Sequence, residues 1–221
     1  GGTGMARPGA VSRAHRGVLF LDECAEISAH ALEALRTPLE DGEIRLARRD
    51  GVACYPARFQ LVLAANPCPC APADPRDCTC KPMEKRRYLG RLSGPLLDRV
   101  DLRVQMHPVR AGAFSDADGE STTQVCSRVA AARDAAAQRW RPHGFHTNPE
   151  VSGALLRRKF RLSNVAMTPL RTALDRGLLS IRGANRTLRV AWTLADLAGR
   201  TSPALDEVAT ALSFRQPGAS R

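Results

Sequence analysis

The first half of the chain carries two short apolar runs with an amphipathic segment between them. The runs, residues 17–21 and 59–65, are typical of strands buried on both faces of a parallel sheet. Residues 28–42 repeat leucines at helical spacing, with Ser28 as the expected N-cap and Gly42 at the expected end. A strand, a helix and a second strand in this order predict an α/β fold.

Three further segments complete this first part. Residues 43–59 alternate apolar and polar positions about an Asp-Gly pair, which predicts a β-hairpin. Residues 84–94 are predicted to be helical, with a second helical turn around Leu96. Residues 100–109 are predicted to form a third strand.

The second half differs in kind. Residues 111–121 are small and polar and predict a linker. Residues 122–215 are almost wholly made of Ala- and Leu-rich segments with helical periodicity, which predict a small all-α domain. We therefore expect one domain over residues 1–110 and a helical domain after the linker.

Composition and charge limit which locations and partners the protein can be expected to have. No apolar run approaches the roughly 20 residues that span a bilayer, and the first residues lack the apolar stretch of a signal peptide. We therefore expect a cytoplasmic protein without a membrane partner and, because it does not begin with Met, a part of a longer one.

The net charge of +11 favours a nucleic-acid partner. Genome composition is the alternative source of this charge, because arginine far outnumbers lysine.

Polar side chains follow both apolar runs. Asp22 and Glu23 come directly after the first, at the end of a parallel strand where ligands bind in α/β sheets. An Asp there can hold Mg²⁺, and a following Glu can polarise a water molecule. Asn66 follows the second run, so its amide would lie at the same edge and could orient water. The alternatives are a solvated, helix-capping strand end for the acids and a turn for Asn66.

Four of the seven cysteines crowd into one Pro-rich loop. Cys68, Cys70, Cys78 and Cys80 form two C-x-C pairs, and four thiolates in such a loop can close a structural Zn²⁺ site. In a reducing compartment, clustered cysteines indicate metal ligands before disulfides, although free thiols and oxidised pairs remain alternatives. The three other cysteines lie in apolar patterns and are predicted to be core residues.

Several longer stretches carry a family resemblance. They are "RPGAVSRAHRGVLFLDECAEIS", "LEALRTPLEDGEIRLARRDGVACYPARFQLVLAANPCPC", "RRYLGRLSGPLLDRVDL" and "LLSIRGANRTLRVAWTLADLAG". Together they resemble the bacterial Mg-chelatase-like AAA+ ATPases of the ComM/YifB type, over nearly the whole chain. The resemblance implies a partial AAA+ core, a parallel sheet with flanking helices, followed by an all-α lid. It also implies ATP as ligand and a homo-oligomeric, hexameric ring.

The resemblance implies roles for the polar residues at the strand ends. "LFLDE" is similar to a Walker B strand, so Asp22 would be the Mg²⁺-associated acid and Glu23 the catalytic carboxylate. Asn66 would be sensor 1, the residue that senses the γ-phosphate and positions the attacking water.

Three arginines acquire roles in the same way. "LLDRVDL" resembles the stretch with the arginine finger, so Arg99 would reach the γ-phosphate bound by a neighbouring subunit. "RGANRTLRVA" resembles the sensor 2 helix, with Arg186 as the phosphate contact and Arg189 in reserve. A guanidinium suits these roles because it is always charged and can bind phosphate through two bonds.

The predicted hairpin carries Arg48 and Arg49 beside its turn. In related ring ATPases, a hairpin before sensor 1 enters the central pore and contacts DNA. Two guanidiniums on a narrow projection suit phosphate contacts, which position DNA without reading its sequence. A charged tip kept polar for solubility is the alternative.

One motif of the family is not found in these 221 residues. No G-x-x-x-x-G-K-[ST] occurs, and in the family this phosphate loop precedes the Walker B strand. We therefore expect the N-terminal P-loop part of the core to be missing and the chain as given not to hydrolyse ATP by itself.

Three functions are compatible with these features. The first is a part of a ring ATPase that remodels branched or single-stranded DNA, through branch migration in recombination and natural transformation. The second is a magnesium chelatase motor that drives Mg²⁺ insertion into a porphyrin. The third is a non-catalytic DNA-binding or oligomerisation module. The cysteine loop and the arginine-tipped hairpin favour DNA over a porphyrin-handling partner.

Overall fold

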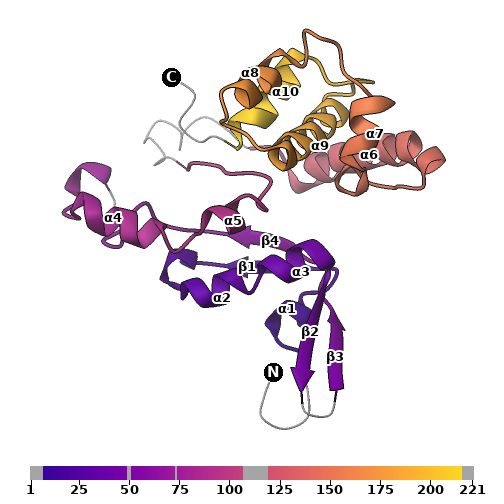
Figure 1. Ribbon diagram of the computed structural model, residues 1–221. Helices are drawn as coiled ribbons and strands as arrows, with labels where there is room; N and C mark the ends of the chain where they lie inside the picture. The colour runs from indigo at the N-terminus through magenta and orange to yellow at the C-terminus, as the bar shows by residue number, and fades with distance from the viewer. Residues whose placement is uncertain (1–6, 49–50, 73, 107–118, 216–221) are drawn as a thin grey trace. The chain divides into compact units, whose positions relative to one another are not determined.

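A computed structural model describes residues 7–48, 51–72, 74–106 and 119–215 (Figure 1). Internal packing divides the chain into two compact units, Gly1–Val100 and Asp101–Arg221. The first unit is mixed α/β with a parallel strand pair and the second is helical, which confirms the predicted fold class. None of the helices in the described ranges is long and apolar enough to cross a membrane.

The first unit is organised about two parallel strands, β1 (Val18–Leu21) and β4 (Gln60–Leu63). Their register pairs Val18 with Gln60 and Leu21 with Leu63, so the two strands end side by side. Its helical elements are α1 (Ala10–Arg13), the 3-10 turn η1 (Cys24–Glu26), α2 (Ala29–Glu33), α3 (Arg36–Asp41), the 3-10 turn η2 (Pro75–Asp77), α4 (Pro82–Leu89) and α5 (Gly94–Leu97).

The predicted helix over residues 28–42 forms as two short helices, α2 and α3. The Ser28 hydroxyl accepts the Ala31 N–H, as expected of a cap, and Gly42 ends the segment in the left-handed region with φ +71°. The helix breaks near Ala34 because Pro38, four residues on, has no N–H for the Ala34 carbonyl.

Apolar packing covers one face of the strand pair. Leu32 and Leu35 from the helices and Leu96 from α5 form a buried cluster that contacts the inward-facing leucines of both strands. On the other face Val18 is 62% exposed and Phe20 57% exposed. The prediction that β1 is buried on both faces is therefore wrong for the described residues, since helices contribute leucines to one face only.

A hairpin projects from this unit (Figure 1). It consists of β2 (Glu43–Arg48) and β3 (Gly51–Pro56), which pair antiparallel with Arg48 opposite Gly51, as the alternating pattern predicts. Cys54 on β3 is exposed, and so is Cys126 in the second unit, so their prediction as core residues is wrong. Cys24 is buried as expected.

The predicted third strand is absent where the structure describes it. Residues 101–106 form no strand, and residues 107–118 lie outside the described ranges. The Arg103 N–H instead donates to the carbonyl of Phe214, 2.8 Å away, at the end of the last helix of the second unit. A bond to a helix end replaces the sheet pairing that the alternating pattern suggested.

The second unit is wholly helical within the residues that are described. Its elements are α6 (Thr122–Trp140), the 3-10 turns η4 (Arg141–His143) and η5 (Asn148–Glu150), α7 (Gly153–Arg158), α8 (Thr168–Asp175), α9 (Ile181–Leu197) and α10 (Leu205–Ser213). The long helix α9 packs against α6, α7, α8 and α10 and forms the centre of the unit.

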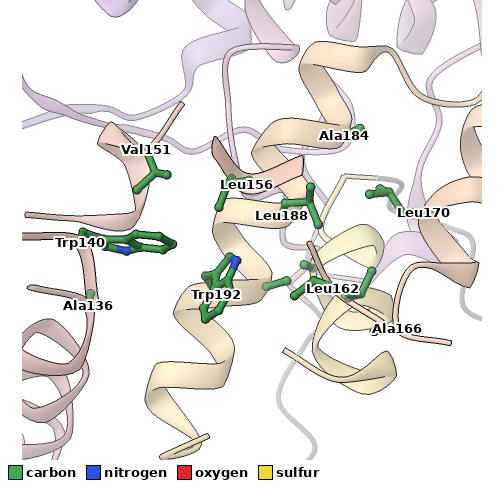
Figure 2. Packing of buried hydrophobic residues seen from close by; sticks show 13 residues of the cluster. Ala136, Trp140, Val151, Leu156, Leu162, Ala166, Leu170, Ala184, Leu188 and Trp192 are labelled. Atoms are coloured by element: carbon green, nitrogen blue, oxygen red, sulfur yellow. The ribbon is translucent and has the colours of Figure 1, made fainter. Parts of the chain in front are cut away.

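An aromatic group fills the middle of this core (Figure 2). The Trp140 ring meets the Phe160 ring edge-on at 4.7 Å and the Trp192 ring at 5.5 Å, and both tryptophans are buried. Such edge-to-face pairs add to the free energy of burying their large surfaces. They join α6 to α9 through the side chains of both helices.

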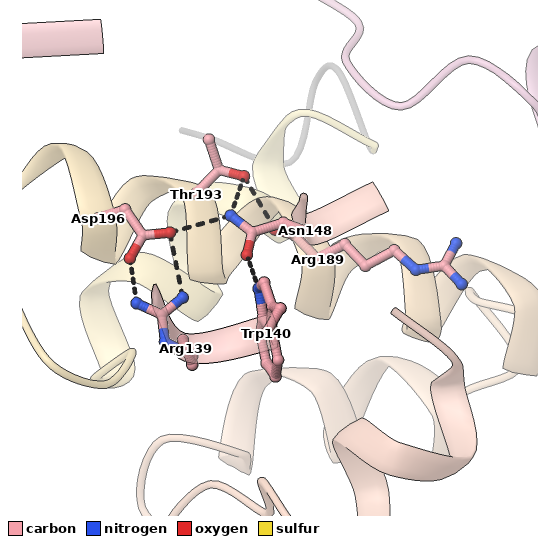
Figure 3. A network of polar contacts seen from close by, with 6 residues as sticks. All are labelled: Arg139, Trp140, Asn148, Arg189, Thr193 and Asp196. Carbon is pink, nitrogen blue, oxygen red and sulfur yellow. Dashed lines mark hydrogen bonds and ion pairs between the residues drawn. The ribbon is translucent and has the colours of Figure 1, made fainter. Parts of the chain in front are cut away.

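Next to the tryptophans lies a buried polar network (Figure 3). Asn148 accepts the indole N–H of Trp140 at 2.6 Å and donates to the Asp196 carboxylate at 3.0 Å. Asp196 also pairs with Arg139, whose guanidinium lies 4.3 Å from the Trp192 ring centroid. Asn148 is buried at the start of η5, where it joins three elements.

Replacing Asp196 with Asn should lower the free energy of unfolding of the second unit by about 3 kcal/mol, because the buried Arg139 charge loses its counter-charge. Urea unfolding followed by tryptophan fluorescence reports this unit, since both tryptophans of the chain lie in it. The matched control is Asp134→Asn, an exposed acid on α6, which should stay within about 0.5 kcal/mol of the parent. Equal losses in both variants would contradict the role given to the network.

Candidate active site at the sheet edge

The chain makes a sharp turn directly after β1. Glu23 adopts the left-handed conformation, φ +47° and ψ +38°, which is uncommon for a residue with a side chain and costs about 1 kcal/mol. The Asp22 carboxylate accepts the Glu23 N–H at 2.9 Å and holds the turn. Both acids are exposed. A strained, side-chain-supported turn thus fixes the direction in which the Glu23 side chain leaves the strand.

Hydrogen bonding continues beyond the two strands. The Ala64 N–H donates to the Leu21 carbonyl at 3.0 Å, and the Cys24 N–H donates back to the Ala64 carbonyl at 2.8 Å. Neighbouring strands lie about 4.8 Å apart, so the segments that follow them start at the same edge. This edge is the strand-end edge, defined here by Asp22, Glu23 and Asn66. All three of these residues are exposed there.

The strand-end edge offers two carboxylates and an amide to solvent. Carboxylate and amide oxygens are ligands that Mg²⁺ accepts, with water completing the octahedron. An exposed carboxylate beside such an ion can also accept a proton from a water molecule. The sequence predicted that Asp22, Glu23 and Asn66 share an edge; the register ends β1 one residue before Asp22 and β4 three residues before Asn66, side by side.

The arginine predicted as a finger, Arg99, is held inside its own unit. Its guanidinium pairs with Glu40 at 2.8 Å and donates to the Pro95 carbonyl at 2.7 Å, and the side chain is only 8% exposed. In this conformation Arg99 does not reach outward. A contact with a neighbouring subunit's phosphate would require the ion pair with Glu40 to open.

The two arginines of the predicted sensor 2 helix lie on α9, in the second unit. Arg186 pairs with Asp101 at 2.6 Å. The Nε–H of Arg189 donates to the Val151 carbonyl at 2.9 Å, and burial lowers the pKa of Arg189. Arg186 is therefore the more adaptable of the two, since its partner is a carboxylate that an anionic ligand can replace.

The hairpin tip is only partly described. The backbone of Arg48 pairs with Gly51 at the end of the ladder, whereas Arg49 lies outside the described residues. The hairpin itself is confirmed, and the contact of its tip with DNA stays a prediction.

The four loop cysteines gather into one cluster. Their sulfur atoms all lie within 4.8 Å of one another, and the Cys68 sulfur is 3.5 Å from the sulfurs of both Cys70 and Cys78. Four sulfurs around a tetrahedral Zn²⁺, with Zn–S bonds near 2.3 Å, are about 3.8 Å apart. The cluster thus has the size that a four-thiolate zinc site requires.

The thiols of this cluster differ in acidity. The backbone N–H of Cys80 and the ammonium of Lys85 lower the pKa of Cys78 to about 6. The hydrogen bond with Cys70, together with burial, raises the pKa of Cys80 to about 12. Cys78 therefore ionises before Cys68 and Cys80 and is better prepared than they are to take up a metal ion.

Some residues that contact the predicted site residues could not be predicted from the sequence. Glu40 and Asp101 hold Arg99 and Arg186, yet no local pattern connects members of either pair. Lys85 was part of a predicted helix, and its proximity to Cys78 arises because α4 follows the cysteine loop directly. These contacts join distant or differently structured segments, so only the folded chain shows them.

Two family matches cover nearly the whole chain. Residues 1–114 match the family described as magnesium chelatase, subunit ChlI. Residues 119–215 match the family described as magnesium chelatase, subunit ChlI C-terminal.

Individual relatives match over similar lengths. An uncharacterized protein of Mycobacterium tuberculosis is 85% identical over 221 residues, which are 100% of this chain and 44% of that protein. The competence protein ComM of Haemophilus influenzae is 36% identical over 97% of this chain and 42% of ComM. The magnesium-chelatase 38 kDa subunit of Rhodobacter capsulatus is 31% identical over 94% of this chain and 54% of that subunit. The chain therefore spans about half the length of these relatives, or less.

At pH 7, iodoacetamide should modify Cys78 of the metal-free chain faster than Cys80, because the thiolate is the nucleophile and only Cys78 is largely ionised. Since falling pH protonates the thiolate, lowering the pH from 7 to 5 should slow the Cys78 reaction about tenfold. Mass spectrometry of the labelled peptides measures both rates. Equal labelling of the two cysteines at pH 7 would show that their environments do not differ in this way.

Proposed function

The chain belongs to the magnesium chelatase subunit ChlI family, as its resemblance to the ComM/YifB type indicated, and from this we propose that it forms part of a ring ATPase that remodels DNA. ATP hydrolysis would drive the branch migration of joined DNA strands in the cytoplasm. The family match supports the general kind of protein, a nucleotide- and Mg²⁺-using motor. The substrate and the individual residue roles are parts of the proposal.

The strand-end edge is the observation that carries the proposal. Asp22 would hold Mg²⁺, directly or through water, and Glu23 would polarise the water that attacks the γ-phosphate. Asn66 would orient that water through its amide. The left-handed turn at Glu23 supports this division of roles, because the Asp22 carboxylate accepts the Glu23 N–H and braces the turn from which the exposed Glu23 side chain extends.

Arginines would supply the remaining phosphate contacts. Arg99 would act on the nucleotide of a neighbouring subunit in a homo-hexameric ring, and Arg186 would contact the γ-phosphate from the lid, with Arg189 in reserve. Both Arg99 and Arg186 are paired with carboxylates in this conformation. Nucleotide binding would therefore exchange an internal carboxylate for a phosphate at each of these two sites.

The proposed ligands are ATP and Mg²⁺ at the strand-end edge and a structural Zn²⁺ at the four clustered cysteines. The size of the sulfur cluster supports zinc, because a closed four-thiolate site is the usual form of structural zinc. Such a site leaves no open position, so the zinc would not take part in hydrolysis.

DNA is the proposed substrate on three grounds. The chain carries a net charge of +11, and the hairpin places Arg48 at its end, next to Arg49 in the sequence. ComM, the relative from Haemophilus influenzae, is named as a competence protein, which connects it with DNA taken up by cells. Positive charge on a narrow projection favours contacts with the phosphates of branched or single-stranded DNA.

Two other functions are alternatives. The relative from Rhodobacter capsulatus is named as a subunit of magnesium chelatase, so a motor for inserting Mg²⁺ into a porphyrin is the second candidate. The third is a DNA-binding or oligomerisation module without catalysis. A gel shift with branched DNA separates the first candidate from the second, and dependence of the shifted complex on nucleotide separates the first from the third.

Joining the P-loop segment of the family ahead of the first residue should give ATP turnover that the 221-residue chain lacks. In that version, Glu23→Gln should lower kcat about 10²- to 10⁴-fold, because the side chain no longer accepts the proton of the attacking water. A coupled ATPase assay measures turnover, and fluorescent-nucleotide titration checks that binding persists. The matched control is Glu43→Gln, a surface acid paired with Arg45, which should retain turnover. Equal rates with and without the P-loop, or full activity of Glu23→Gln, would refute the proposed site.

Changing both Arg48 and Arg49 to Ala should weaken DNA binding by the chain. The slope of log K against log salt concentration should fall by about 2, since two phosphate contacts are lost. Fluorescence anisotropy with branched DNA at several salt concentrations measures the slope. Arg133→Ala with Arg176→Ala removes the same charge from exposed positions in the second unit and serves as control. An unchanged slope in the hairpin variant would remove the hairpin from the DNA interface.

A further inference from the structure

The cysteine loop leaves the sheet at the strand-end edge and returns to it through a helix. It starts two residues after Asn66, at Cys68, and ends at Cys80, two residues before α4. We propose that one Zn²⁺ bound by the four cysteines acts as a clamp that fixes the position of Asn66 relative to Glu23. The proposal rests on the function assigned to the strand-end edge and adds a metal-dependent control of its shape.

The described residues of the loop offer few other restraints on its form. Between the cysteine pairs they form the 3-10 turn η2 and an ion pair between Asp74 and Arg76 at 2.9 Å. Arg76 is 90% exposed, and ion pairs of this kind contribute little to stability. Among the described residues, most of the short distances between one cysteine pair and the other are distances between sulfur atoms. A metal ion joining these sulfurs would therefore be the main restraint on the loop.

The first end of the clamp is Cys68. Its side chain is 2% exposed, although the neighbouring Pro67 and Pro69 are exposed. The Ala71 N–H donates to the Cys68 carbonyl at 3.3 Å, and Ala71 takes a left-handed conformation that bends the chain back, with Cys68 and Cys70 sulfurs 3.5 Å apart. Only Pro67, whose ring fixes φ, separates Cys68 from Asn66. Holding the Cys68 sulfur therefore restricts where the Asn66 amide can lie.

The second end of the clamp lies beyond Cys80. Helix α4 packs against η1, and its Tyr88 is buried. Just after α4, the Arg91 guanidinium donates to the Ala25 carbonyl at 2.7 Å and pairs with Glu26 at 3.1 Å. Ala25 and Glu26 belong to the turn η1 that starts directly after Glu23. The helix that follows the cysteine loop therefore holds the segment that follows the catalytic carboxylate.

Together with one further hydrogen bond, these contacts connect the two ends of the cysteine loop through η1, and this closed path is called the circuit. The Cys24 N–H donates to the Ala64 carbonyl, which joins η1 back to the end of β4, two residues before Asn66. The chain thus runs from the end of β4 through the cysteine loop to α4, which contacts η1, and η1 is bonded back to the end of β4. Within the described residues, packing or hydrogen bonds hold every part of this path except the loop. Zinc would secure the remaining part, because binding to a structural site contributes directly to folding free energy.

The first measurement is the zinc content of the purified chain under reducing conditions. We expect one zinc per chain, with X-ray absorption showing four sulfur ligands at about 2.3 Å. Cys78→Ser should lose the zinc, whereas Cys126→Ser, the same substitution at an exposed cysteine on α6, should keep it. Absence of zinc, or a mass lower by two hydrogen atoms from an oxidised cysteine pair, would overturn the metal site.

The second measurement is hydrogen exchange at the amides of Cys24 and Ala64, whose bonds close the circuit. Chelating the zinc should speed exchange at both amides about tenfold, and adding zinc back should restore it, while amides of α9 keep their rates. Reversal by added zinc separates this effect from simple unfolding of a variant. Unchanged rates in a chain that has lost its zinc would overturn the clamp while leaving the metal site standing.

The Arg91→Ala variant separates the clamp from metal binding. It should keep its zinc but lose protection at Cys24, because the Arg91 bonds to Ala25 and Glu26 of η1 are gone. Arg87→Ala, an exposed arginine on the same helix, should change neither readout. Full protection in Arg91→Ala would overturn the second end of the clamp. Neither measurement uses nucleotide, so failure of the ATPase proposal and failure of the clamp give different results.

Discussion

The parallel pairing of β1 with β4 is the constraint on which the rest of the account depends. Its register ends both strands together, and two further hydrogen bonds, from Ala64 to the Leu21 carbonyl and from Cys24 to the Ala64 carbonyl, continue it past the strands. Without this pairing, Asp22 and Asn66 would be distant positions on a loop-rich chain. With it, two exposed acids and an amide follow strands that end side by side, and the cysteine loop starts there.

The candidate phosphate contacts share a second feature. Arg99 and Arg186 are each paired with a carboxylate, Glu40 and Asp101 respectively. A guanidinium binds carboxylate and phosphate through the same geometry, so an internal acid can hold it until a nucleotide arrives. The charges are thereby satisfied in the free chain, and under the proposed function the cost of releasing each acid would become part of the free energy of nucleotide binding.

Much of the fold could be predicted from local pattern, and the errors share a cause. Helix α6 lies in the segment predicted to be helical, Ser28 caps where its type predicts, and the hairpin forms with Arg48 opposite Gly51. The exposed face of β1 and the absence of a strand over residues 101–106 were missed because burial and pairing depend on which segments pack together, which periodicity does not encode. The cysteine cluster could be predicted because its spacing is local, whereas its connection to η1 through Arg91 could not.

The central claim is that Asp22, Glu23 and Asn66 present one metal-binding edge. Titration with Mn²⁺ and ATP, followed by nuclear magnetic resonance of the chain carrying a P-loop segment, tests it directly, because bound Mn²⁺ broadens the signals of nearby nuclei. The account predicts that the Asn66 side-chain amide and the Glu23 backbone amide broaden together, at the same concentration of Mn²⁺. Broadening at Glu23 with a sharp, unchanged Asn66 amide would contradict it.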